Sequence, residues 1–430
     1  MKEKDRPYSK TTRIIHGAAK TARWDFSHHV VPPLTSTSTY RLESVRRGAA
    51  GFERYGQFPD GDEPPVYIYD RLEDPTRNLL ESQLADIEGV EACVTFASGM
   101  AAVAAALGSV LSAGDAVVAH PLLYGCTHSL LTRWMPRLGV GVARADFTSL
   151  EAVAAAVTPA TRVLYFESPV NPNLDIVDLE GVATLAAAVN ATRAPERRLL
   201  TVIDNTFATP FCQRPSAFGI DLVVHSLTKN IGGFGTEVGG AVLCSRDFYE
   251  GLMGYRKDFG GILSPKSAWS ILVYGVPTLS LRLKRQQYTA QKVAEFLEAH
   301  PLVRSVRYPG LASFPRRALA EKQMRDFDGE FAPGGMIYFE LDDTRVEPSD
   351  FVDTLAADAY CVTLAVSLGH VKTLVELPAQ MTHSAYAGEG AMKTAPGVRL
   401  SVGLESPADI VADLETALSA VQRAPAKAGG

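Results

Sequence analysis

The stretch DLVVHSLTKNIGGFG, residues 221–235, joins a short apolar run to a lysine and a glycine-rich turn. The run 222–224 predicts a buried strand, and Lys229 follows shortly after its end. A lysine placed there lies in a low-dielectric environment, which lowers the pKa of its amine and makes it nucleophilic. The hydroxyls of Ser226 and Thr228 suit a phosphate, and the glycines let the backbone approach a ligand closely. A P-loop is excluded, because in a P-loop the glycines precede the lysine, whereas here they follow it. An ordinary surface lysine after a strand remains the alternative.

Similar short runs rich in Val, Ile and Leu alternate with helical segments before this stretch. Such alternation is typical of a mostly parallel sheet with helices on both faces. The expected strands are 94–96, 115–119, 140–143, 163–166, 200–203 and 222–224. After about residue 278 there is more helix for each strand, and the strands that we expect there are 336–341, 362–366 and 398–402. We therefore predict an α/β domain over residues 74–278 and a smaller α+β domain over residues 279–430.

Residues 1–73 show no sustained period, and the part between Leu42 and Tyr67 is rich in Gly, Pro, Asp and Arg. We interpret this region as an extended arm that packs on another subunit rather than forming its own core.

The composition is that of a globular protein, with 46% hydrophobic and 21% charged residues. The net charge of −6 argues against nucleic acid as a partner. Five cysteines in 430 residues do not suggest a disulfide framework. Neither a signal peptide nor a membrane-spanning run is evident, so we expect a cytoplasmic protein. We expect no metal site, because the adjacent pair His28–His29 lacks further ligands.

Two further segments suggest a cofactor. Asp204 follows the expected strand 200–203, at the strand end that faces the ligand crevice of a parallel sheet. A carboxylate there can keep a pyridine nitrogen protonated while Lys229 holds an aldehyde, which is how proteins tune pyridoxal 5'-phosphate (PLP), although Asp204 alone could equally cap a turn. At Ser98–Gly99 a strand enters a helix whose first N–H groups can bind an anion. Together the three segments predict PLP on a fold-type-I, aminotransferase-like scaffold.

The sequence resembles the trans-sulfuration (Cys/Met metabolism) family of PLP enzymes. This family includes cystathionine γ-synthase, the cystathionine γ- and β-lyases, methionine γ-lyase and O-acetylhomoserine sulfhydrylase. The matching motifs occur in the family's order over residues 69–404: YDRLEDPT (69–76), ASGM (97–100), LYGCT (123–127), ESPVNP (167–172), VIDNT (202–206), HSLTK (225–229), VSLG (366–369) and VRLSVG (398–403).

The resemblance implies a role for each matched residue. Lys229 would carry PLP as a Schiff base and move protons, Asp204 would pair with the pyridinium nitrogen, and Tyr124 would stack on the ring and act as an acid. Arg399 would bind the substrate α-carboxylate beside Ser367 and Leu368, and Asn171 would bind the 3' oxygen of PLP. The expected phosphate ligands are Ser98, Gly99, Met100, Ser226 and Thr228, with Tyr69 and Arg71 from the neighbouring subunit of a homotetramer built as a dimer of dimers.

Three positions depart from the family pattern. Asp74 replaces the usual Asn, and Tyr274 and Pro277 replace the Arg and Lys of the motif Arg-Gly-x-Lys-Thr. The Asp74 change could alter the charge beside Arg71. The changes at Tyr274 and Pro277 mean that the family pattern does not predict the geometry of the helix and loop there.

The substrate is suggested by the residue before Ser367. Some family members carry Glu there, facing the distal ammonium of cystathionine, whereas this chain has Val366. An apolar residue favours a short thioether amino acid, and Cys126 and Lys257–Asp258 also resemble methionine γ-lyase. We therefore expect a PLP-dependent γ-lyase acting on methionine or a related amino acid. The alternatives are γ-replacement on an O-activated homoserine and a catalytically silent homologue, which the retained Lys229 argues against.

Overall fold

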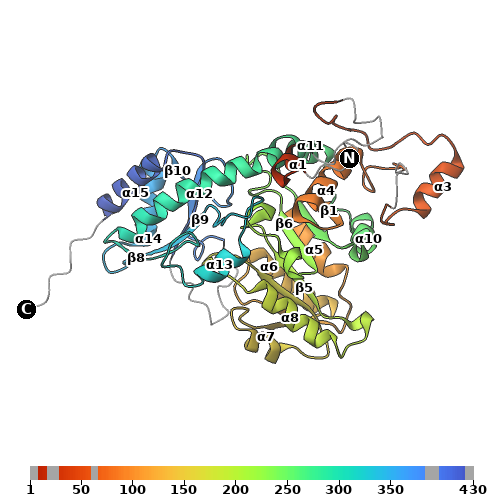
Figure 1. Cartoon of the computed structure of the whole chain (residues 1–430), viewed down its shortest axis with the longest axis horizontal. Coiled ribbons are helices and arrows are strands. Elements are labelled where there is room, and N and C mark those ends of the chain that lie inside the picture. Colours follow the sequence, from red (N-terminus) through yellow and green to blue (C-terminus); the bar gives the residue numbers. More distant parts are fainter. Residues whose placement is uncertain (1–7, 17–28, 60–65, 383–396, 422–430) are drawn as a thin grey trace, which may run out of the picture.

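The computed structural model describes residues 8–16, 29–59, 66–382 and 397–421. Two sheets occupy different parts of the molecule, and the long helix α12 (Val276–Ala299) runs from the larger toward the smaller (Figure 1). No helix among the described residues is both long and apolar enough to cross a membrane.

The larger sheet has seven strands in the order β1-β7-β6-β5-β4-β2-β3. Its strands are β1 (Ala92–Phe96), β2 (Ala116–Ala119), β3 (Gly141–Arg144), β4 (Thr161–Glu167), β5 (Leu200–Asp204), β6 (Leu222–Ser226) and β7 (Gly240–Cys244). Strands β2 to β6 pair in parallel, whereas β7 lies antiparallel between β1 and β6. The sequence did not indicate β7, because only residues 236–239 separate its run GAVLC from the glycine-rich turn after Lys229.

Helices cover both faces of this sheet, and alternate residues of each strand point to opposite faces. Val223 packs in a cluster with α4 (Pro75–Glu88) and α8 (Leu179–Asn190), whereas Val224 packs with α5 (Gly99–Gly108) and α10 (Tyr249–Phe259). The remaining helices of this part are α6 (Gly125–Ser129), α7 (Leu150–Ala156), α9 (Thr209–Cys212) and α11 (Pro265–Ser270). The carboxyl ends of β4, β5 and β6 lie side by side, and Glu167 pairs with Asp204 in register.

The smaller sheet has five strands in the order β10-β11-β12-β9-β8. They are β8 (Val303–Arg307), β9 (Met336–Leu341), β10 (Val362–Leu364), β11 (Thr373–Glu376) and β12 (Val398–Ser401). Helices α14 (Pro348–Asp358) and α15 (Pro407–Val421) pack in one cluster with this sheet, whereas α13 (Arg317–Gln323) packs in the cluster of the larger part. Strands β8 and β11 were not predicted, because polar residues interrupt β8 and because β11 has only two apolar residues in succession, Leu374 and Val375. The α/β prediction with a second, smaller sheet is confirmed.

The departures at Tyr274 and Pro277 fall at the start of α12. A π-turn at Ile271–Gly275 leads into this helix, and Pro277 is its second residue. Proline is accommodated in the first turn of a helix, where its missing N–H has no intrahelical partner to lose.

The N-terminal arm contains two helices that the sequence did not indicate, α1 (Lys10–His16) and α3 (Val45–Glu53). Ser44 caps α3 by accepting a hydrogen bond from the Arg47 N–H. Helix α3 stands away from the rest of the molecule at the right of Figure 1. Packing of this arm on another subunit remains a prediction.

Candidate active site

Lys229 lies in the turn after β6, partly buried at the carboxyl edge of the larger sheet. Its Nζ donates a hydrogen bond to Ser367 Oγ at 2.5 Å, which joins the two parts of the chain. Burial, reinforced by the cation of Arg399, lowers the pKa of Lys229 to about 8, while Glu376 and Asp204 act in the opposite direction. About half of the lysine amine is therefore unprotonated near pH 8, where an ordinary lysine keeps its proton.

Asp204 ends β5, beside β6. Its Oδ1 accepts a hydrogen bond from the Thr206 N–H at 3.0 Å, so the carboxylate does cap the following turn. Burial raises the pKa of Asp204, and the charges of His225 and Lys229 oppose this rise. The capping role and a role toward a cofactor are compatible, because a carboxylate has two oxygens.

Helix α5 begins against the end of β6. A Cβ added to Gly99 would lie 2.8 Å from the Cβ and 2.9 Å from the Oγ of Ser226, so only glycine permits this approach. The Ser98 hydroxyl caps α5 by accepting from the Ala101 N–H, which leaves the N–H groups of Gly99 and Met100 without intrahelical partners. Such an N-terminus, beside the Ser226 hydroxyl, suits a phosphate.

Thr228, an expected phosphate ligand, already makes hydrogen bonds to the protein backbone. Its hydroxyl donates to the Gly239 carbonyl oxygen at 3.3 Å and accepts from the Gly239 N–H at 3.1 Å. Thr228 therefore ties the lysine turn to the segment leading into β7, in addition to any contact with phosphate.

Arg399, on β12, is buried, and its charge acts on Lys229. Its Nη1 donates to Asn171 Oδ1 at 2.8 Å, and its Nη2 donates to the Ser367 carbonyl oxygen at 3.1 Å and pairs with Glu376 Oε1 at 2.8 Å. Because Asn171 accepts through its oxygen, its amide NH₂ remains a donor for another group. Burial lowers the pKa of Arg399, and Glu376 opposes this effect.

Tyr124 precedes α6, and its N–H donates to the buried carboxylate oxygen Glu167 Oε1 at 2.6 Å. Its phenol oxygen lies 3.5 Å from Cys126 Sγ. Burial, with a contribution from Cys126, raises the pKa of Tyr124 to about 12, so the phenol keeps its proton at neutral pH and can act as an acid.

The predicted substrate residues of the VSLG segment differ in burial. Leu368 is buried in a cluster with Leu174, Phe207, Met336 and Tyr338. Ser367 has a positive φ of 95°, which turns the chain so that its hydroxyl meets Lys229. Val366 is 55% exposed beside it. The residue that precedes Ser367 in the chain is therefore apolar and largely exposed.

Tyr69 and Arg71 lie apart from this group. Tyr69 is 41% exposed, and the Arg71 guanidinium lies over its ring at 5.7 Å while donating to the Lys257 carbonyl oxygen. In the described part of the chain no contact joins either residue to Lys229. A role of both residues in a neighbouring subunit's site remains a prediction.

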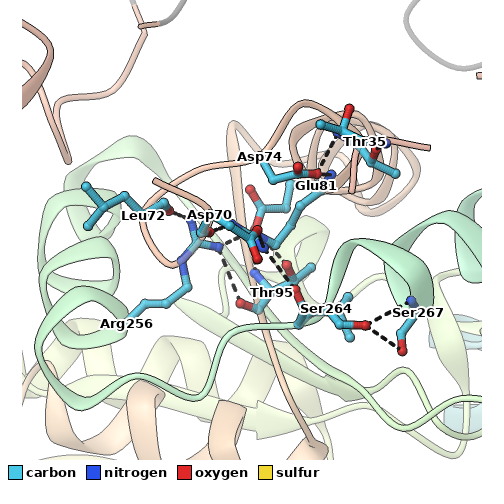
Figure 2. A network of polar contacts seen from close by, with 12 residues as sticks. Thr35, Asp70, Leu72, Asp74, Glu81, Thr95, Arg256, Ser264 and Ser267 are labelled. Carbon is cyan, nitrogen blue, oxygen red and sulfur yellow. Dashed lines mark hydrogen bonds and ion pairs between the residues drawn. The ribbon is translucent and has the colours of Figure 1, made fainter. Parts of the chain in front are cut away.

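Buried arginines anchor the backbone on both sides of Arg71. Arg256 donates to the Leu72 carbonyl oxygen at 3.0 Å and pairs with Glu81 Oε1 at 2.6 Å (Figure 2). Arg77 pairs with Asp70 Oδ1 at 3.0 Å. Arg77 also donates to the Asp70 carbonyl oxygen, so the backbone on both sides of the exposed Arg71 is held by a buried arginine.

The Asp74 departure has a structural role in the same region. Its carboxylate caps α4 by accepting from the Thr76 and Arg77 N–H groups, and Oδ2 accepts from the Tyr40 hydroxyl at 2.7 Å. Asp74 therefore joins the arm to the first helix of the α/β part.

Sequence reasoning missed two carboxylates. Glu376 was given no role, although a single acid at the end of the apolar strand β11 is a usable signal. Glu167 was quoted within a motif but assigned nothing, and it holds the Tyr124 backbone. Burial and the neighbouring Asp204 raise the pKa of Glu167 well above its usual range.

No group of three His, Cys, Asp or Glu side chains that could hold a metal occurs among the described residues, and His28 lies outside them.

An aspartate ends β5 and a lysine follows the end of the neighbouring strand β6. The N-terminus of α5 lies against Ser226 at the end of the same strand β6, and this arrangement suits PLP on a fold-type-I scaffold. A family model described as Cys/Met metabolism PLP-dependent enzyme matches residues 11–419. The chain therefore belongs to this family, and its cofactor is PLP.

Relatives and solved structures agree with this assignment. The L-methionine gamma-lyase of Pseudomonas deceptionensis is 39% identical over 426 residues, 98% of this chain and 100% of that protein. The L-methionine gamma-lyase of Pseudomonas putida is 41% identical over 414 residues, 95% and 97% of the two chains. A crystal structure of cystathionine gamma-lyase from Lactobacillus plantarum, complexed with L-serine, is similar with a TM-score of 0.82 and 33% identity, covering 96% of this chain and 99% of that one.

The residues present fit PLP chemically. Because Gly99 has no Cβ, the α5 N-terminus lies close against Ser226, so its backbone N–H groups and the serine hydroxyl are near each other. The lysine amine has a lowered pKa, as formation of a Schiff base at moderate pH requires. A carboxylate stands at the adjacent strand end, where a pyridine nitrogen needs a partner.

Proposed function

We propose that this protein catalyses γ-elimination on methionine or a related sulfur amino acid, giving 2-oxobutyrate, ammonia and a thiol. The observation that carries the proposal is the position of Val366. It borders Ser367, whose hydroxyl accepts from Lys229, and it is apolar. A side chain of this kind cannot pair with a distal ammonium, but it suits a thioether. The two relatives named L-methionine gamma-lyase support the same choice.

Two residues would handle protons during the reaction. Bound PLP supplies an electron sink at the substrate. Lys229, with its lowered pKa, would take the proton from the substrate Cα and return protons to the carbon chain. Tyr124, protonated at neutral pH, would donate to the leaving sulfur.

The other residues would hold the reactants. Arg399 would bind the α-carboxylate with its charge-assisted N–H groups, and the Asn171 amide would donate to the 3' oxygen of PLP. Asp204 would keep the pyridine nitrogen protonated. The phosphate would be bound by Ser98, Gly99, Met100, Ser226 and Thr228, with backbone N–H groups of α5 as the main donors.

The site would be complete only in an assembly. Tyr69 and Arg71 are exposed, and no contact among the described residues joins them to the lysine of their own chain. We propose that they reach the phosphate in a neighbouring subunit, within a homotetramer of catalytic dimers. A cytoplasmic location is part of the same proposal.

γ-Replacement on an O-activated homoserine is the second candidate, since the apolar Val366 would suit that substrate as well. One experiment separates the two reactions. The purified protein is incubated with methionine, cystathionine, homocysteine, or O-acetylhomoserine plus a thiol, and 2-oxobutyrate, ammonia and thioether are measured. Elimination predicts 2-oxobutyrate and ammonia in equal amounts from methionine, with less from cystathionine. Formation of a thioether from O-acetylhomoserine, with no 2-oxobutyrate from methionine, would overturn the proposal of γ-elimination.

A further inference from the structure

Glu376 and Arg399 form a buried ion pair between neighbouring strands. The two residues lie directly opposite each other in the antiparallel pairing of β11 and β12. Their side chains are 1% and 3% exposed, and Glu376 Oε1 lies 2.8 Å from Arg399 Nη2. Opposed residues on adjacent strands share one face of a sheet, so the backbone register itself brings the two charges together.

The pair is fixed from several directions. The Thr382 hydroxyl donates to Glu376 Oε1 at 2.9 Å. On the other side, Asn171 Oδ1 and the Ser367 carbonyl oxygen accept from Arg399. Glu376 Oε2 is buried and accepts no hydrogen bond from the described residues. Within that part of the chain, Oε1 therefore makes the polar contacts of this carboxylate, with Arg399 and Thr382.

A buried cation needs a counter-charge. Removing water from a guanidinium is costly, and deletion of one partner of a buried pair leaves an uncompensated charge. The other acceptors of Arg399, an amide oxygen and a backbone carbonyl, are neutral. Glu376 is thus the anion in direct contact with Arg399 among the described residues.

We propose that Glu376 is a positioning residue for the substrate-carboxylate site: it fixes the Arg399 guanidinium before substrate arrives and supplies its counter-charge. This inference rests on the proposed function, in which Arg399 binds the α-carboxylate. Glu376 itself does not touch the substrate in this account.

The charge of Glu376 also reaches the two proton-handling residues. It raises the pKa of Lys229 and of Tyr124, whereas the charge of Arg399 lowers both. The other titratable neighbours are Asp204, which also raises the pKa of Lys229, and Cys126, which raises that of Tyr124. Glu376 and, more weakly, Glu167 raise the pKa of Arg399. Loss of the Glu376 charge alone therefore favours the unprotonated form of Lys229.

Three variants of the holoenzyme separate position from charge. Glu376→Leu removes both the acceptor and the charge, whereas Glu376→Gln keeps an oxygen for Arg399 Nη2 and a similar volume. Glu340→Gln is the matched control, because Glu340 lies on β9 of the same sheet and accepts from the Ser305 hydroxyl. For each variant, KM and kcat for methionine are measured, together with the pH midpoint of the visible absorbance change that reports a proton at Lys229 Nζ.

Glu376→Leu should raise KM about tenfold or more while kcat falls less, since an ionic hydrogen bond that orients Arg399 is lost. Glu376→Gln should raise KM less, and it should lower the absorbance midpoint by about half a pH unit or more. Glu340→Gln should behave as wild type in both measurements.

An unchanged KM in Glu376→Leu, or an unchanged midpoint in Glu376→Gln, would overturn the proposal. If Glu376→Leu does not fold, the near-isosteric Gln variant decides. The absorbance titration needs no turnover, so a wild-type protein inactive on methionine would refute the proposed function while still testing the role of Glu376.

Discussion

Replacing Gly99 with alanine tests the phosphate site through a single methyl group. The new Cβ would lie 2.8 Å from the Cβ and 2.9 Å from the Oγ of Ser226, and 3.2 Å from its Cα. A rotation of the serine hydroxyl cannot relieve contacts with Cβ and Cα, so the start of α5 must move. Gly240 blocks movement in one direction, because it already packs so closely on the Ser98 carbonyl that its own Cβ would lie 2.2 Å away.

The cost of such overpacking is about 1–3 kcal/mol. If most of it appears as displacement of the Gly99 and Met100 N–H groups, the Kd for PLP should rise by a factor of about 5 to 150. The assay is titration of the apoenzyme with PLP, followed by visible absorbance, with the Tm measured in parallel.

Gly251→Ala is the control for this experiment. Gly251 lies in α10, and its added Cβ would make an ordinary contact, 3.8 Å from Ser109 Cβ. Alanine in a helix interior is favoured over glycine by about 1 kcal/mol, so the Tm should not fall and the Kd for PLP should be unchanged. A Gly99→Ala protein that binds PLP within about twofold of wild type, at an unchanged Tm, would refute the assignment of α5 as the phosphate site.

Three further predictions concern substrate choice, assembly and pH. Val366→Glu should shift the ratio of kcat/KM toward cystathionine over methionine by about two- to fivefold. The effect should be modest because Val366 is half exposed and solvent screens the new charge. An unchanged ratio would mean that residue 366 does not face the distal group of the substrate. Arg71→Ala should weaken PLP binding by about 1.5–3 kcal/mol without unfolding the chain, and hybrids re-formed with Lys229→Ala subunits should regain activity; no recovery counts against a shared site. The rate of PLP attachment to the apoenzyme should rise with pH and level off above about 8, the pKa of Lys229. With an unperturbed lysine the rate would rise through about pH 10, so a continued rise would show that the pKa of the Lys229 amine is not lowered.

Much of the larger sheet could be predicted from sequence because each parallel strand is a separate apolar run. Strand β7 was not predicted, because only four residues separate it from the glycine turn of Lys229, and its pairing with β1 and β6 reveals it. Helix α3 was not predicted either. Its sequence VRRGAAGFE contains two glycines, which favour other conformations.

The residues that bear the chemistry were predictable from their place in motifs, whereas their supports were not. The partnership of Glu376 with Arg399 depends on the register of β11 and β12, which lie more than twenty residues apart in sequence. Likewise, the anchoring of Leu72 by Arg256 joins distant segments through a backbone carbonyl. Backbone acceptors carry no side-chain signal, so contacts of this kind become visible only in the folded chain.

The central claim is that PLP is bound covalently to Lys229 in a chain that performs γ-elimination. The most direct measurement is borohydride reduction of the purified holoenzyme, followed by digestion and mass spectrometry of the peptides. The account predicts a pyridoxyl modification on Lys229, in the peptide that contains HSLTKN, and loss of the visible absorbance together with activity. A modification confined to another lysine, or none at all, would contradict it.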